Sequence, residues 1–121
     1  MTAAVEGRTI GSMSSDPRMA EAVEQIVTRI VRRFDPERVI LFGSHARGNA
    51  APDSDVDLLV VMDVEGSRRR KAVEIGVAVH DIRVAKDIVV TTPSGFAARR
   101  SVAGTIERQA VKEGRVVYER L

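Results

Sequence analysis

Residues 39–61 read VILFGSHARGNAAPDSDVDLLVV, and this stretch decides the fold of the chain. An apolar run ends at Gly43-Ser44, a small polar loop follows, and a second apolar run begins just after Asp55 and Asp57. Nearly continuous apolar runs of this length are typical of central strands that are covered on at least one face. The stretch therefore predicts two central strands, over 38–42 and 57–62, joined by a polar loop.

The residues at the end of the first apolar run favour an anion-binding site. Gly43 lets the backbone turn sharply or come close to a ligand. If Ser44 opens a short helical turn, its free backbone N–H groups and its hydroxyl form a cradle for an anion. A phosphate group would fit such a cradle.

Asp55 and Asp57 stand one residue apart at the start of the second apolar run. In a strand, residues i and i+2 project from the same face and lie roughly 6.6 Å apart along the strand. Two carboxylates on one face repel each other and resist burial, and a divalent cation relieves both problems. Because Cys is absent and His is not clustered, the oxygen donors favour Mg²⁺. The alternative, a turn capped by Asp55 and Ser54, does not explain a carboxylate that leads directly into Leu-Leu-Val-Val.

The rest of the chain supplies helices and further strands. Apolar residues at steps of three and four predict an amphipathic helix from Asp16-Pro17 to near Asp35-Pro36. Further helices are predicted from a cap at Ser67, over 94–100 and over 105–113, and further strands over 87–92 and 115–118. The strand over 115–118 is expected at the edge of the sheet. In the last helix we expect three residues to face inward: Ile106, Ala110 and Val111.

These elements predict a single domain of the α/β (α+β) class. We expect a small mixed sheet of about four strands, flanked by helices, over residues 15–121. Residues 1–14 are small and polar and show no sustained period. They are expected to form a disordered extension.

The composition limits the classes of function. Charged residues make up 30% of the chain and the net charge is +2, which gives little reason to expect direct nucleic-acid binding. The absence of Cys excludes disulfides and thiolate catalysis and fits a reducing cytoplasm. No apolar run approaches the roughly 20 residues that a membrane span needs. We therefore expect a cytoplasmic protein without membrane contact.

Four cations, Arg68-Arg69-Arg70-Lys71, stand at the start of the second predicted helix. They oppose the helix dipole at that end. Either they are solvated, or an anion lies nearby. The sequence leaves three interpretations of this cluster open: simple solvation, contact with a triphosphate, and contact with a partner.

The order Gly43-Ser44, ten residues, Asp55, one residue, Asp57 resembles the nucleotidyltransferase superfamily of the DNA polymerase beta type. It is most similar to the minimal nucleotidyltransferases, small stand-alone members that often pair with HEPN-domain proteins as antitoxins. The neighbouring residues also match such proteins: Ala46, Arg47, Gly48 and Ser54. The resemblance implies the minimal nucleotidyltransferase fold.

The resemblance also implies roles for particular carboxylates. Asp55 and Asp57 would hold the metal that carries the nucleotide. In such proteins a third acidic residue, on the strand after the second helix, completes a site for two Mg²⁺ ions and accepts the proton of the acceptor. Asp87 is the position that matches, and Asp81, six residues upstream, is the alternative.

The resemblance further implies that Gly43 and Ser44 bind the outer phosphates of ATP. Arg47 is a separate inference from its chemistry, because a guanidinium group can hold phosphate oxygens in a bidentate way. The alternative for Arg47 is an ordinary surface ion pair.

The implied function is Mg²⁺-dependent transfer of AMP from ATP to a hydroxyl of a partner protein. The partner would be a HEPN-domain toxin, and the chain its antitoxin. A small-molecule hydroxyl acceptor stays open as an alternative, although the aminoglycoside nucleotidyltransferases carry an additional helical domain for such a substrate. A non-catalytic antitoxin that neutralises its partner by binding is also left open.

Overall fold

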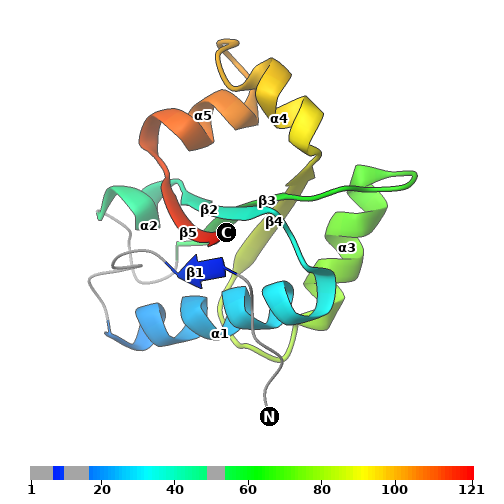
Figure 1. Cartoon of the computed structure of the whole chain (residues 1–121). Helices are drawn as coiled ribbons and strands as arrows, with labels where there is room; N and C mark the ends of the chain where they lie inside the picture. The colour runs from blue at the N-terminus through cyan, green and yellow to red at the C-terminus, as the bar shows by residue number, and fades with distance from the viewer. Residues whose placement is uncertain (1–6, 10–16, 49–53) are drawn as a thin grey trace.

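Figure 1 shows the computed structural model of the chain, in which residues 7–9, 17–48 and 54–121 are described. The elements follow in the order β1 (Gly7–Thr9), α1 (Pro17–Phe34), β2 (Arg38–Phe42), α2 (Ser44–Arg47), β3 (Val56–Val61), α3 (Arg68–Ala78), β4 (Lys86–Thr91), α4 (Pro93–Arg99), α5 (Ile106–Glu113) and β5 (Arg115–Arg120). The strands form one sheet in the order β1-β5-β2-β3-β4. The pairing of β3 with β4 is parallel and the other pairings are antiparallel. The predicted small mixed sheet flanked by helices is confirmed.

The sheet has one strand more than the four or so that the sequence predicted. Gly7–Thr9 pair antiparallel with β5, although they fall within the segment 1–14 that we expected to be disordered. Three residues are too few for a period of two to stand out in a sequence. The other residues of that segment, 1–6 and 10–14, lie outside the described residues. Because of β1, β5 is not the edge strand that we predicted.

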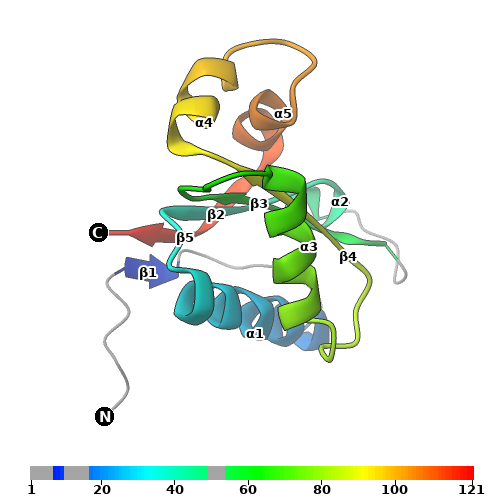
Figure 2. The ribbon, with the colours of Figure 1, turned by 90° about the vertical axis from the view of Figure 1, so that its right-hand side faces the viewer.

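Helices cover both faces of the sheet (Figures 1 and 2). On one face α1 and α3 enclose the larger core cluster, which includes Ile26 and Leu58. On the other face α4 and α5 cover a smaller cluster, which includes Leu59 and Phe96. Leu58 and Leu59 are neighbours whose side chains point to opposite faces, as in any strand. The apolar run of β3 therefore contributes side chains to both core clusters.

Pro17 is the first described residue of α1, and Asp16, the predicted cap of this helix, lies outside the described residues. The predicted cap of α3 is confirmed. Ser67 caps α3, where its Oγ accepts a hydrogen bond from the Arg70 N–H at 3.1 Å. None of the helices in the described ranges is long and apolar enough to cross a membrane.

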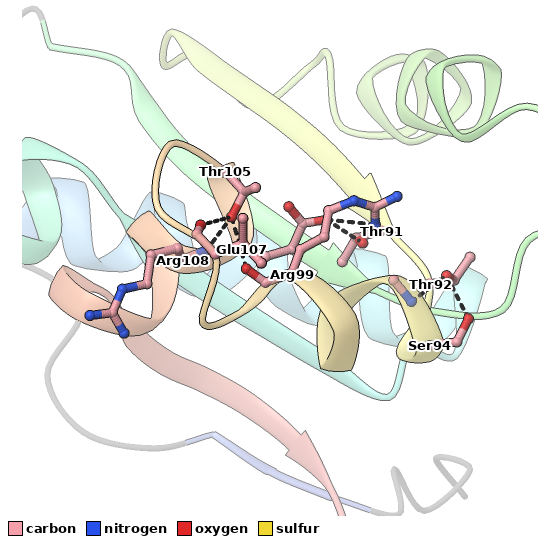
Figure 3. A network of polar contacts seen from close by, with 9 residues as sticks. Thr91, Thr92, Ser94, Arg99, Thr105, Glu107 and Arg108 are labelled. Atoms are coloured by element: carbon pink, nitrogen blue, oxygen red, sulfur yellow. Dashed lines mark hydrogen bonds and ion pairs between the residues drawn. The ribbon is translucent and has the colours of Figure 1, made fainter.

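The inward face of α5 differs from the prediction at one position. Ala110 is buried and Val111 is partly buried, but Ile106 is 38% exposed and Glu107 is buried. The carboxylate of Glu107 accepts a hydrogen bond from the Thr91 hydroxyl at 2.8 Å (Figure 3). A carboxylate in the first turn of a helix is also stabilised by the helix dipole. Polar partners, and not apolar spacing alone, therefore set the rotation of this helix.

We expect Glu107→Ala to lower the free energy of unfolding by about 1–3 kcal/mol, because it leaves the buried Thr91 hydroxyl without its acceptor. Urea unfolding followed by circular dichroism measures the change. The control is Glu74→Ala, which removes an exposed carboxylate that pairs with Lys71 and should lower it by less than about 1 kcal/mol. Equal losses for the two variants would contradict the role given to Glu107.

Asp81 follows α3 and pairs with Arg29 of α1. The hydrogen bond from Arg29 holds the pKa of Asp81 below its ordinary value of 3.8. A depressed pKa in the folded state stabilises the fold above the unfolded pKa, and this contribution is lost as the pH falls through the folded value. We expect the difference in Tm between wild type and Asp81→Asn to shrink as the pH falls from about 6 to about 3. Thermal melts at each pH test this, and a difference that does not change with pH would contradict it.

Candidate functional site

Polar residues gather where β2, β3 and β4 lie side by side. Asp57 of β3 pairs with Phe42 at the end of β2 on one side and with Asp87 of β4 on the other. Because β3 and β4 are parallel and in register, the side chains of Asp57 and Asp87 project from the same face. Adjacent strands are about 4.8 Å apart. The structure thus brings two of the predicted carboxylates together from residues 30 positions apart in the sequence.

The charges of the predicted carboxylates act on one another. Burial of Asp57, followed by the negative charges of Asp87 and Asp55, raises the pKa of Asp57 above its ordinary value of 3.8, and the charges of His45 and Arg47 lower it. Asp55 therefore lies near Asp57, although it precedes β3. This is the mutual repulsion that the sequence predicted for Asp55 and Asp57, with Asp87 added to it.

Asp81, the alternative third carboxylate, lies elsewhere. It is paired with Arg29 of α1, on the face of the sheet that α1 and α3 cover. Asp87, in contrast, projects from the same face as Leu59 and Val61, which pack against α4 and α5. Of the two candidates, the structure places Asp87 beside Asp57.

Gly43 sits in close contact with the carboxylate of Asp57. Its φ is 76°, a left-handed conformation that favours glycine. A Cβ at this position would lie 2.3 Å from Oδ2 of Asp57. Ser44 opens α2 directly after it, as the anion cradle requires. Any side chain at position 43 would therefore displace the Asp57 carboxylate.

Arg47 is engaged by a residue that the sequence did not point to. Its Nη1 lies 3.0 Å from Oε1 of Glu113, at the end of α5. A hydrogen bond from Gln109, together with the charge and hydrogen bond of Arg47 and the N–H of Gly43, holds the pKa of Glu113 below its ordinary value of 4.5. Glu113 thus takes up two of the donors that were predicted to bind phosphate. No motif spacing could have found it, because the partners are 66 residues apart.

His45 has a structural contact that could not be predicted from the sequence. It is buried, and its Nε2 lies 2.9 Å from the backbone oxygen of Ser54. The contact ties α2 to the residue that precedes Asp55. His45 therefore helps to hold the start of β3 beside the Gly43-Ser44 turn.

The donor set fits a magnesium ion. Among the described residues, no group of three or more His, Cys, Asp or Glu side chains is arranged to hold a metal ion. Mg²⁺ commonly uses only one or two carboxylates and completes its shell with water and substrate phosphates. Asp55 and Asp57 provide hard oxygen donors, and their two negative charges repel each other. A divalent cation beside them would offset this repulsion.

Three comparisons place the chain among known proteins. Residues 23–117 match the family model of the nucleotidyltransferase domain. A relative from Methanocaldococcus jannaschii, named "putative protein adenylyltransferase", is 25% identical over 111 residues, which are 88% of this chain and 100% of the relative. The structure of a "putative minimal nucleotidyltransferase" has a TM-score of 0.56 and 29% identity and covers 88% of this chain and 98% of that one.

A toxin–antitoxin complex determined with AMP-PNP has the same fold, with a TM-score of 0.52, 22% identity and coverage of 79% of this chain and 73% of that one. The family match runs from α1 to β5 and includes Gly43-Ser44 and all three aspartates. The chain therefore belongs to the nucleotidyltransferase domain family and is a nucleotidyltransferase with the fold of the minimal members.

Proposed function

We propose that this nucleotidyltransferase transfers AMP from ATP to a hydroxyl group of a partner protein, with Mg²⁺ as cofactor. The observation that carries the proposal is the register of Asp57 with Asp87, beside the Gly43-Ser44 turn. The relative named "putative protein adenylyltransferase" supports AMP and a protein acceptor. The fold shared with a complex that contains AMP-PNP supports ATP as the donor.

Each predicted residue has a part in the proposed reaction. Asp55 and Asp57 would hold the magnesium ion that accompanies the nucleotide, and Asp87 would contribute to a second one. Magnesium bound at these carboxylates would neutralise charge on the phosphates and on the departing pyrophosphate. Gly43 and Ser44 hold the outer phosphates, and this leaves the α-phosphorus near the carboxylates.

The bonds and charges balance without a further reactant. The oxygen of the acceptor hydroxyl forms a bond to the α-phosphorus of ATP. The bond from that phosphorus to the bridging oxygen breaks, and pyrophosphate leaves with the electron pair. Asp87 accepts the proton of the hydroxyl, as a carboxylate in hydrogen-bond reach of the acceptor can do.

The architecture supports a separate protein as the acceptor. In the part of the chain that the structure describes, the longer helices pack on the one sheet and form no additional acceptor domain. A small-molecule acceptor would need such a surface from elsewhere. The resemblance to minimal nucleotidyltransferases and the shared fold with a toxin–antitoxin complex support a HEPN-domain toxin as the partner. The reaction would take place in the cytoplasm, where ATP is present and a chain without Cys needs no oxidising environment.

We expect Asp87→Asn to slow AMP transfer by about 10²–10⁴-fold, the usual effect of losing a general base. Intact-mass spectrometry of the co-purified partner, after incubation with ATP and Mg²⁺, measures the AMP added. Asp81→Asn is the matched control. It removes a carboxylate six residues before Asp87 that lies on the face of the sheet covered by α1 and α3. Removal of Mg²⁺ with EDTA should stop transfer by the wild-type protein.

Other outcomes of this experiment assign different functions. A partner that stays bound and unmodified with wild type would contradict AMP transfer and favour inhibition by binding. Transfer at an equal rate by Asp87→Asn and wild type would remove Asp87 from the mechanism. Asp87 is exposed, and removal of one of three like charges reduces repulsion, so a Tm close to that of wild type confirms that the variant is folded.

A further prediction follows from the position of Glu113. We expect Glu113→Gln to tighten ATP binding by up to about fivefold, because the carboxylate competes with phosphate for Arg47 and the Gly43 N–H. Isothermal titration calorimetry with ATP and Mg²⁺ measures the affinity, and Glu74→Gln is the control. Weaker binding by Glu113→Gln would show that Glu113 instead positions Arg47 for the phosphates.

A further inference from the structure

A groove runs along the outer side of β4. This strand ends the order of the sheet, and it lies between α3 and the pair α4 and α5 (Figure 1). A pocket of about 750 Å³ is lined by consecutive residues of β4 from Asp87 to Val90, by the start of α3, and by residues of α4 and α5. The carboxylate proposed to accept the proton therefore lines this pocket.

Three arginines line this pocket, and one of them is paired with a carboxylate. Arg68 and Arg69 of α3 and Arg99 of α4 line it. Arg99 pairs with Glu107 at 3.5 Å. Arg68 and Arg69 are exposed, and neither makes an ion pair or side-chain hydrogen bond with a residue that the structure describes. Glu107 is buried and already bonded to Thr91, and Asp87 is the other carboxylate of the lining. Three arginines against two carboxylates leave the pocket with an excess of positive charge.

The surface continues as an apolar strip. A second pocket of about 470 Å³ shares Arg69, Ala72 and Ile88 with the first. It is also lined by Val73, which is 62% exposed. We call the two pockets together the β4 groove. It combines arginines, apolar side chains and the free edge of a strand.

The order of the strands puts the Gly43-Ser44 turn and the β4 groove on opposite sides of the carboxylates. Gly43 and Ser44 follow β2, on one side of Asp57, and the β4 groove lies on the other side, beyond Asp87. ATP held at the Gly43-Ser44 turn would therefore reach the carboxylates from the side of β2. The β4 groove is left for the acceptor.

We propose that the β4 groove binds an acidic, extended segment of the acceptor protein and presents its hydroxyl to Asp87. This inference rests on the proposed function, because Asp87 is there the carboxylate on the acceptor side. An extended segment can pair through its main chain with the free edge of β4. Arg68 and Arg69 can hold carboxylates of the segment in a bidentate way.

The four cations at residues 68–71 differ in their relation to the β4 groove. Arg68 and Arg69 line the groove, whereas Arg70 lines neither of its two pockets. Lys71 pairs with Glu74 at 3.0 Å. Arg70 therefore offers a matched control, since it stands on the same first turn of α3 and is exposed like its neighbours. A change to Glu in this turn favours the helix dipole equally at each of these positions.

The first experiment measures binding of fluorescein-labelled peptides to the full chain by fluorescence anisotropy. The probes are an acidic peptide, Glu-Asp-Tyr-Glu-Asp, and a neutral one in which Gln and Asn replace the acidic residues. We expect wild type to bind the acidic peptide at least about tenfold more tightly, with an affinity that falls as salt is added. The double variant Arg68→Glu/Arg69→Glu should lose this preference, and Arg70→Glu should retain it. Equal binding of both peptides by wild type, or no binding of either, would overturn the proposal.

A second measurement separates this proposal from the proposed function. ATP affinity and AMP transfer to the co-purified partner are measured for the same variants. A higher KM for the partner in Arg68→Glu/Arg69→Glu, with unchanged ATP affinity, supports the groove as the acceptor site. A loss of ATP affinity would reassign the arginines to the nucleotide, and an unchanged KM would also overturn the proposal. Selective binding of the acidic peptide without any AMP transfer would contradict the proposed function and leave the binding site in place.

Discussion

The parallel pairing of β3 with β4 is the constraint on which the site depends. It holds Asp57 beside Asp87, although two carboxylates side by side repel each other. The apolar residues that follow on each strand, such as Leu58 and Val90, are buried and fix the register. A slip of one residue would turn every side chain of the strand to the other face. It would expose this core, and the stability of the core therefore keeps the carboxylates together.

Different helices cover the two faces of the sheet. α1 and α3 cover one face with the larger core, and α4 and α5 cover only part of the other. Leu59 and Val61 are buried under them, whereas Asp87 stays exposed. The contact of Glu107 with Thr91 and Arg99 ties α5 to β4 and α4. Asp87 consequently lies beyond the cover of α4 and α5 and lines the β4 groove.

Much of the fold could be predicted from the sequence. The apolar positions predicted α1, β2, β3 and β4 to within one or two residues, and the cap at Ser67 was found from residue type. The Gly43-Ser44 and Asp55-x-Asp57 pattern indicated the family, which the match to the nucleotidyltransferase domain confirms. The roles of these residues in catalysis stay predictions.

Local pattern and spacing within about twenty residues were therefore determined by the sequence itself. Tertiary structure decided what depends on residues far apart: the pairing of β1 with β5, the burial of Glu107 in place of Ile106, and the ion pair of Arg47 with Glu113. It also decided between Asp87 and Asp81 as the neighbour of Asp57. Strand register and helix packing fix such contacts, and both arise from the summed burial of the core. This total burial cannot be predicted from any short stretch of the sequence.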